Sequence, residues 1–172
     1  MGFFLLIPFF LVRFPLLAAR SKDAISRAAH FPPLNGWEKL AYWVYQLSTA
    51  GIILCIRISR TRTKPAALFF AGLAVYLAGL FLLAASVIHF AAPAPNGMNR
   101  QGLYRFSRNP MYLAYFILFL GCVLLTQSLV LFGLLAVFQT SAHWIILAEE
   151  RWCREQFGEE YRRYKQQVRR YL

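Results

Sequence analysis

Five long runs of apolar residues, separated by short polar segments, dominate the sequence. The runs occupy residues 2–19, 40–58, 66–90, 111–125 and 129–148. A helix needs about 20 mostly apolar residues to cross a bilayer, and only the run at 111–125 falls well short of that length. We therefore predict a single all-α integral membrane domain over residues 1–172, with about five transmembrane helices.

The first run is interrupted by Pro8, Arg13 and Pro15. No charged segment precedes it, as one would in a secretory signal peptide, so we interpret it as a membrane helix kinked by its prolines. In the third run Gly72 and Gly79 lie seven residues apart, on one helix face. This spacing predicts close packing against a neighbouring helix.

The last two runs are separated by only three polar residues, at 126–128. A turn this short requires antiparallel neighbours, so we predict a C-terminal helical hairpin. The two ends away from the turn must then lie close together. This would place Arg108, Asn109 and Tyr112 near Glu149 and Glu150.

The charged tail at 149–172 carries apolar side chains at intervals of three to five residues. They are Trp152, Phe157, Tyr161, Tyr164, Val168 and Tyr171. Such spacing predicts an amphipathic helix on the surface of an anionic membrane. We expect it to bend at Gly158 and to cover a site at the end of the hairpin.

Composition agrees with this pattern, since 59% of residues are hydrophobic, 15% are charged and the mean hydropathy is +0.46. Lys and Arg total 19 against seven acids, a formal charge of +12. These cations flank the apolar runs, so we expect a membrane surface as their partner rather than nucleic acid. The three cysteines are isolated, which predicts neither a disulfide framework nor a metal site.

The distribution of Lys and Arg predicts the orientation. Segments 20–39 and 91–110 and the tail carry four, three and seven cations and share one side, whereas the 126–128 turn carries none. Because cytoplasmic loops are enriched in Lys and Arg, we expect a multi-pass protein of a bacterial inner membrane with a cytoplasmic C terminus. The cations Arg57, Arg60, Arg62 and Lys64 lie on the opposite side and do not fit this pattern.

Two motifs flank the hairpin. The first has Gly-Leu-Tyr at 102–104 and Ser-Arg-Asn-Pro-Met-Tyr at 107–112; the second has Glu-Glu at 149–150 and Phe-Gly-Glu-Glu-Tyr at 157–161. Together they resemble the isoprenylcysteine carboxyl methyltransferase family, whose wider relatives include membrane phospholipid N-methyltransferases. The resemblance covers roughly the last 80 residues. It implies methyl transfer from S-adenosyl-L-methionine to a lipophilic acceptor, such as a membrane lipid or a lipidated small substrate.

The resemblance also implies a set of site residues. Carried over by position, the cofactor-binding residues are His89, Asn96, Gly97, Met98, Asn99, Tyr104, Asn109, Pro110, Met111, Tyr112, Glu149 and Glu150, and the candidate catalytic residues are Arg108 and Glu149. The acidic pair would hold the ammonium group or the ribose hydroxyls of the cofactor, and Arg108 its carboxylate. Tyr104 and Tyr112 would pack on adenine or face the sulfonium.

The chain departs from that family at two positions. Asn109 stands where the family has a histidine, and an amide can hydrogen-bond but cannot act as a base. Ile145 stands where the isoprenylcysteine enzymes have an arginine assigned to the substrate side. A guanidinium suited to a carboxylate acceptor is therefore missing at that position.

Other interpretations compete with this hypothesis. Phospholipid N-methylation is the nearest alternative, and sterol reductases that use NADPH share a related Arg-His-Pro motif but have more spans. A non-catalytic membrane scaffold is the third. The acidic pair could also be only the solvated start of the tail, and the segment at 108–110 only an interfacial anchor with a proline at the helix start.

Overall fold

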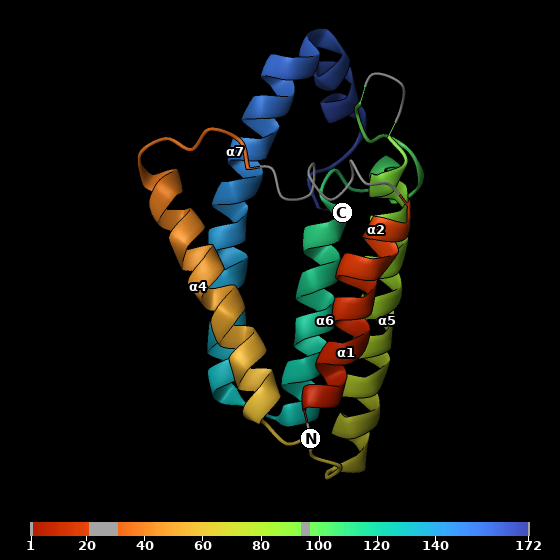
Figure 1. Cartoon of the computed structure of the whole chain (residues 1–172), viewed down its shortest axis with the longest axis vertical. Coiled ribbons are helices and arrows are strands. Elements are labelled where there is room, and N and C mark those ends of the chain that lie inside the picture. Colours follow the sequence, from red (N-terminus) through yellow and green to blue (C-terminus); the bar gives the residue numbers. More distant parts are fainter. Residues whose placement is uncertain (1, 21–30, 94–96, 172) are drawn as a thin grey trace.

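The computed structural model describes residues 2–20, 31–93 and 97–171, and almost all of them are helical (Figure 1). The elements are α1 (Phe3–Leu11), η1 (Val12–Leu16), α2 (Leu17–Arg20), α4 (Trp37–Ile58), α5 (Ala66–Ala91), η2 (Gly102–Arg105), α6 (Pro110–Thr126) and α7 (Leu129–Gln167). Within these ranges there is no β-strand, only an isolated bridge between Ser107 and Arg169. The all-α fold is confirmed.

Four helical stretches are long and apolar enough to cross a membrane. They are Phe3–Arg20, Trp37–Ile58, Ala66–Ala91 and Leu129–Gln167, whereas α6 is shorter, at 17 residues. Large apolar side chains such as Phe4, Phe70 and Phe81 point outward and are more than 60% exposed. An outer surface of this kind is suited to lipid rather than to water, so the membrane fold predicted from the sequence is confirmed.

The first stretch is one helix whose middle turn is wider than an α-helix. The segment η1 is a π-helical turn that contains Arg13 and Pro15. Proline has no backbone N–H to donate to the preceding turn, and π-helical turns often accommodate such an interruption. The predicted proline kink therefore takes the form of a widened turn at residues 12–16.

Two glycines allow α5 and α6 to pack with their backbones close together. A Cβ atom on Gly79 would lie 2.4 Å from the backbone nitrogen of Leu118 in α6. Conversely, a Cβ atom on Gly121 of α6 would lie 2.4 Å from the backbone nitrogen of Tyr76. The close packing expected at Gly79 is confirmed, and its partner is α6.

The hairpin of α6 and α7 is more open than its short turn suggests. The main packing partner of α6 is α5, and that of α7 is α4, so the bundle consists of two helix groups that are connected by the turn (Figure 1). Aromatic rings connect the two groups: Phe119 of α6 lies 5.8 Å from Phe138 of α7, and Phe138 stacks on Tyr45 of α4 at 5.0 Å.

The tail is a continuation of α7. This helix extends beyond Ala148 to Gln167 and kinks at Gly158, which has φ 52° and ψ −125°. A left-handed φ of this kind favours glycine. After the kink, the chain returns toward the start of α6, where the backbone N–H of Arg108 donates to the carbonyl of Arg169 at 3.0 Å.

The apolar face of the tail packs on the protein itself. Tyr161, Tyr164 and Val168 are buried in a small cluster with Met98, from the segment before η2. We expected this face to lie on the membrane surface. In the structure it instead binds the tail to the loop between α5 and α6, and the expected bend at Gly158 is confirmed.

Candidate functional site

The non-turn ends of α6 and α7 meet through Tyr112 and Glu149. The hydroxyl of Tyr112, in the first turn of α6, donates a hydrogen bond of 2.7 Å to Oε1 of Glu149. Both residues are partly buried. The hairpin geometry predicted this proximity.

The neighbouring carboxylate of Glu150 has two arginine partners and is 5% exposed. Nη2 of Arg108 lies 3.0 Å from Oε1 of Glu150. Arg170 binds the same carboxylate through Nε at 2.9 Å and Nη2 at 3.0 Å. The hydrogen bond to the carboxylate of Glu150 raises the pKa of Arg170, so that guanidinium stays charged and the negative charge of Glu150 is compensated.

The carboxylate of Glu149, in contrast, has no such compensation. Among residues 2–20, 31–93 and 97–171, no Lys, Arg or His nitrogen forms an ion pair with it. Its hydrogen bond from the Tyr112 hydroxyl orients the carboxylate without neutralising it. Because a buried charge is costly without an opposite charge, this position is suited to a cationic group of a ligand.

Arg108 retains unused donors beside this carboxylate pair. Its Nε and Nη1 atoms are buried and have no hydrogen-bond partner in the described part of the chain. The side-chain oxygen of Asn99 is also buried, and it has no hydrogen-bond partner among the described residues. Buried polar atoms are normally hydrogen-bonded, so these atoms are suited to the acceptors and donors of a bound molecule.

His89 and Gly102 determine where the loop containing Tyr104 begins. Nδ1 of His89 accepts a hydrogen bond of 3.3 Å from the backbone N–H of Leu103. The imidazole ring lies so close to Gly102 that a Cβ atom there would be 2.2 Å from it, and Gly102 has φ 58°. In the structure His89 therefore positions the loop.

Tyr104 is buried beneath the tail. Its backbone carbonyl accepts a hydrogen bond of 2.6 Å from the hydroxyl of Tyr164. The side-chain amide of Asn109 also binds the tail, because its Nδ2 donates a hydrogen bond of 3.2 Å to the carbonyl of Arg170. These two contacts join the loop, the start of α6 and the end of the chain.

The other predicted residues have different surroundings. Pro110 is the buried first residue of α6, Met111 packs against the main hydrophobic core and Met98 packs in the tail cluster. Gly97 is exposed with φ 85°. Asn96 lies outside the described residues. That these residues bind a cofactor stays a prediction.

Sequence reasoning missed Arg170 and the hydroxyl of Tyr164 as parts of this region. Arg170 was only one of seven cations in a charged tail, and nothing in its spacing connects it to Glu150, twenty residues earlier. Tyr164 was recognised as an apolar-face residue, but its hydrogen bond to the loop depends on how the tail turns at Gly158.

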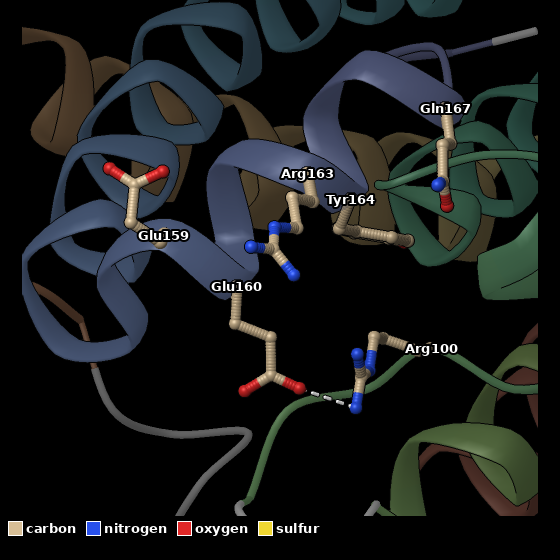
Figure 2. A pocket seen from close by; sticks show the side chains of 6 residues that line it. All are labelled: Arg100, Glu159, Glu160, Arg163, Tyr164 and Gln167. Atoms are coloured by element: carbon tan, nitrogen blue, oxygen red, sulfur yellow. Dashed lines mark ion pairs between the residues drawn. The ribbon is translucent and has the colours of Figure 1, made fainter.

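An open cavity of about 520 Å³ lies between the tail and the segment before η2 (Figure 2). Its lining residues are Arg100, Glu159, Glu160, Arg163, Tyr164 and Gln167. Figure 2 shows Glu160 paired with Arg100, from the opposite side of the cavity. None of the predicted site residues is among its lining residues, so this cavity is distinct from the Tyr112–Glu149 pair.

The fold and the site define an all-α membrane protein with paired acidic and basic side chains where α6 and α7 meet. Residues 87–160 match the family model described as phospholipid methyltransferase. The match confirms the resemblance found in the sequence and contains all of the predicted site residues. Comparisons of the chain with curated proteins and with solved structures returned no match.

Proposed function

We propose that this protein is an S-adenosyl-L-methionine-dependent methyltransferase that acts on a lipophilic acceptor at the membrane. The observation that carries the proposal is the partly buried carboxylate of Glu149, oriented by Tyr112 and without a cationic partner among the described residues. It lies inside the segment that matches the phospholipid methyltransferase family.

The donor set fits the polar groups of the cofactor. The ammonium group would be held by Glu149, and the carboxylate by the unpartnered Nε and Nη1 atoms of Arg108. Charge-assisted hydrogen bonds of both kinds are among the strongest that proteins form. Glu150 has a different role, because its carboxylate already holds Arg108 and Arg170 in place.

When bound, S-adenosylmethionine supplies an electrophilic methyl group on a sulfonium. Methyl transfer depends mainly on positioning and on exclusion of water. In this chain the helix start at Pro110 orients Tyr112, and the tail covers the loop through Tyr164. The acceptor would approach laterally from the bilayer, and the cofactor from the cytoplasm, with the C terminus on that side.

Saturable binding of S-adenosylmethionine to the purified full chain in detergent tests this proposal. We expect Glu149→Gln to weaken binding at least tenfold, whereas Glu155→Gln, a change at an exposed acid in the same helix, should have less than a twofold effect. If NADPH bound in place of S-adenosylmethionine, a reductase function would replace the proposal. If neither bound, a scaffold role would replace it.

Transfer of a radiolabelled methyl group into a lipid extract tests which acceptor is used. A methyl ester formed on a carboxylate releases methanol in mild base, whereas an N-methylated phospholipid keeps its label. Phospholipid N-methylation is the second candidate because of the family match and because Ile145 supplies no guanidinium for a carboxylate. Label that base does not release as volatile methanol would favour it over an isoprenylcysteine-type reaction.

A further inference from the structure

Arg13 is a cation in the middle of a helix that is apolar enough to cross the membrane. It lies ten residues after Phe3 and seven before Arg20 in the stretch Phe3–Arg20. Ionisable side chains inside membrane helices are costly and usually face a pathway or a binding site. None of the functions argued above uses this guanidinium.

The geometry of the first helix turns Arg13 toward α6. Phe9, one helical turn earlier, packs on Tyr115 and Phe119 of α6, with ring centroids 6.1 and 5.6 Å away. Side chains four residues apart share one helix face. The guanidinium of Arg13 correspondingly interacts with the hydroxyl of Tyr115 and lies 5.9 Å from the ring centroid of Phe14.

A group of tyrosines connects Arg13 to the candidate site. The hydroxyl of Tyr45, on α4, interacts electrostatically with Tyr115, Glu149 and Arg13. The ring of Tyr45 also lies 6.3 Å from that of Tyr112, which donates to Glu149. The arginine and the carboxylate therefore face the same group of phenolic side chains from different helices.

Arg13 also has no anionic partner of its own in the described part of the chain. No carboxylate there forms an ion pair with it. The side chain is only partly buried, and its neighbours Phe10 and Phe14 are exposed on the outer surface of the helix. An anion that arrives from the bilayer could therefore reach it.

We propose that Arg13 binds the anionic group of the lipid acceptor, which makes the substrate class a lipid that carries a carboxylate or a phosphate. This inference rests on the proposed function and specifies its acceptor. A guanidinium stays charged at depth and matches the oxygen geometry of both anions.

Binding of simple lipids to the purified full chain tests this role. The probes are oleate, oleyl phosphate and uncharged oleyl alcohol, titrated into wild type, Arg13→Gln, Arg13→Lys and the control Arg57→Gln. Arg57 is an exposed cation at the other end of α4, away from Tyr45. We expect Arg13→Gln to weaken the binding of at least one anion about tenfold or more. The affinity of Arg13→Lys should be intermediate, and that of Arg57→Gln should stay within about twofold of wild type.

The probes and the cofactor separate the possible outcomes. If Arg13→Gln weakens the binding of oleate alone, the acceptor carries a carboxylate. If it weakens the binding of oleyl phosphate alone, the acceptor carries a phosphate. The inference would be overturned if Arg13→Gln bound both anions as tightly as wild type. It would also be overturned if the affinity for oleyl alcohol fell as much as the affinity for the anions. S-adenosylmethionine binding, measured on the same samples, should stay within twofold in Arg13→Gln. If wild type bound anions through Arg13 but did not bind S-adenosylmethionine, the proposed methyltransferase function would be wrong and the anion-binding role of Arg13 would be supported.

Discussion

Tyr112 donates a hydrogen bond of 2.7 Å to Glu149, and this contact joins the first turn of α6 to the point at which α7 leaves its apolar stretch. The carboxylate is thereby oriented by a neutral donor, and in the described part of the chain it has no ion-pair partner. Glu150, the next residue, is fully committed to Arg108 and Arg170. Two adjacent acids thus have different partners: Glu149 accepts from a phenol, and Glu150 pairs with two guanidinium groups.

The first prediction concerns Tyr112→Phe, which removes the hydroxyl and keeps the ring. We expect S-adenosylmethionine affinity to fall about tenfold or more, because a hydrogen bond to a charged group is worth roughly 1.5–3 kcal/mol. Calorimetric titration measures it. Tyr76→Phe is the matched control, since its hydroxyl donates to the carbonyl of Leu5 at 2.8 Å, between α5 and α1. That variant should lower thermal stability and leave cofactor affinity unchanged; equal affinities in both variants would contradict the role given to Tyr112.

The second prediction separates Glu150 from Glu149. Glu150→Gln leaves the buried guanidinium of Arg108 without its carboxylate, and breaking a buried ion pair from one side costs roughly 3–5 kcal/mol. Because Arg170 is about one-third exposed, we expect a loss near the lower limit, about 3 kcal/mol. Thermal unfolding followed by tryptophan fluorescence checks this. Glu155→Gln, at an exposed position on the same helix, should stay within about 0.5 kcal/mol of wild type; a similar loss in both variants would be the opposing result.

The third prediction concerns the approach of α5 to α6. Alanine at Gly79 or at Gly121 places a methyl group 2.4 Å from a backbone nitrogen of the facing helix, so the two helices must separate. We expect each variant to lose about 3 kcal/mol of stability, the upper part of the range for overpacking. Gly133→Ala is the control, since nothing lies within 4 Å of its new Cβ atom. Alanine is favoured over glycine inside a helix, so Gly133→Ala should be at least as stable as wild type. If Gly133→Ala lost as much stability as Gly79→Ala, the packing argument would be contradicted.

Much of this arrangement was predictable from short-range patterns in the sequence. The length of the apolar runs predicts membrane helices, and the three-residue turn predicts that Tyr112 meets Glu149. Arg108 beside Glu150 follows from the same geometry. Each of these inferences uses only the local period of a helix and the length of a connection.

The parts that could not be predicted depend on which surfaces pack together. A helical period shows that Tyr161 and Tyr164 share an apolar face, but it does not distinguish a lipid surface from the loop around Met98. Arg170 reaches Glu150 only because Gly158 reverses the chain. Likewise Arg13 is merely an interruption in an apolar run until the packing of Phe9 on Tyr115 shows which helix it faces.

The fourth prediction concerns the tail as a cover for the site. The hydroxyl of Tyr164 donates to the carbonyl of Tyr104 at 2.6 Å, and Tyr104 lies between two exposed arginines, Arg100 and Arg105, at which trypsin can cut. Tyr164→Phe removes one buried hydrogen bond, worth about 1 kcal/mol. The open population of the loop should therefore rise about fivefold, and in the regime of fast opening tryptic cleavage follows that population.

Time courses of trypsin digestion in detergent, resolved by mass, measure cleavage after Arg100 and Arg105. The control is Arg162→Gln, which breaks an ion pair with Glu159 in which both side chains are about 70% exposed. Exposed pairs of this kind contribute little, so cleavage in the control should match wild type. S-adenosylmethionine should slow cleavage in wild type and less so in Tyr164→Phe, because a loosened tail no longer holds the loop against the site. Equal cleavage rates in wild type and Tyr164→Phe would show that the loop keeps its position without the tail.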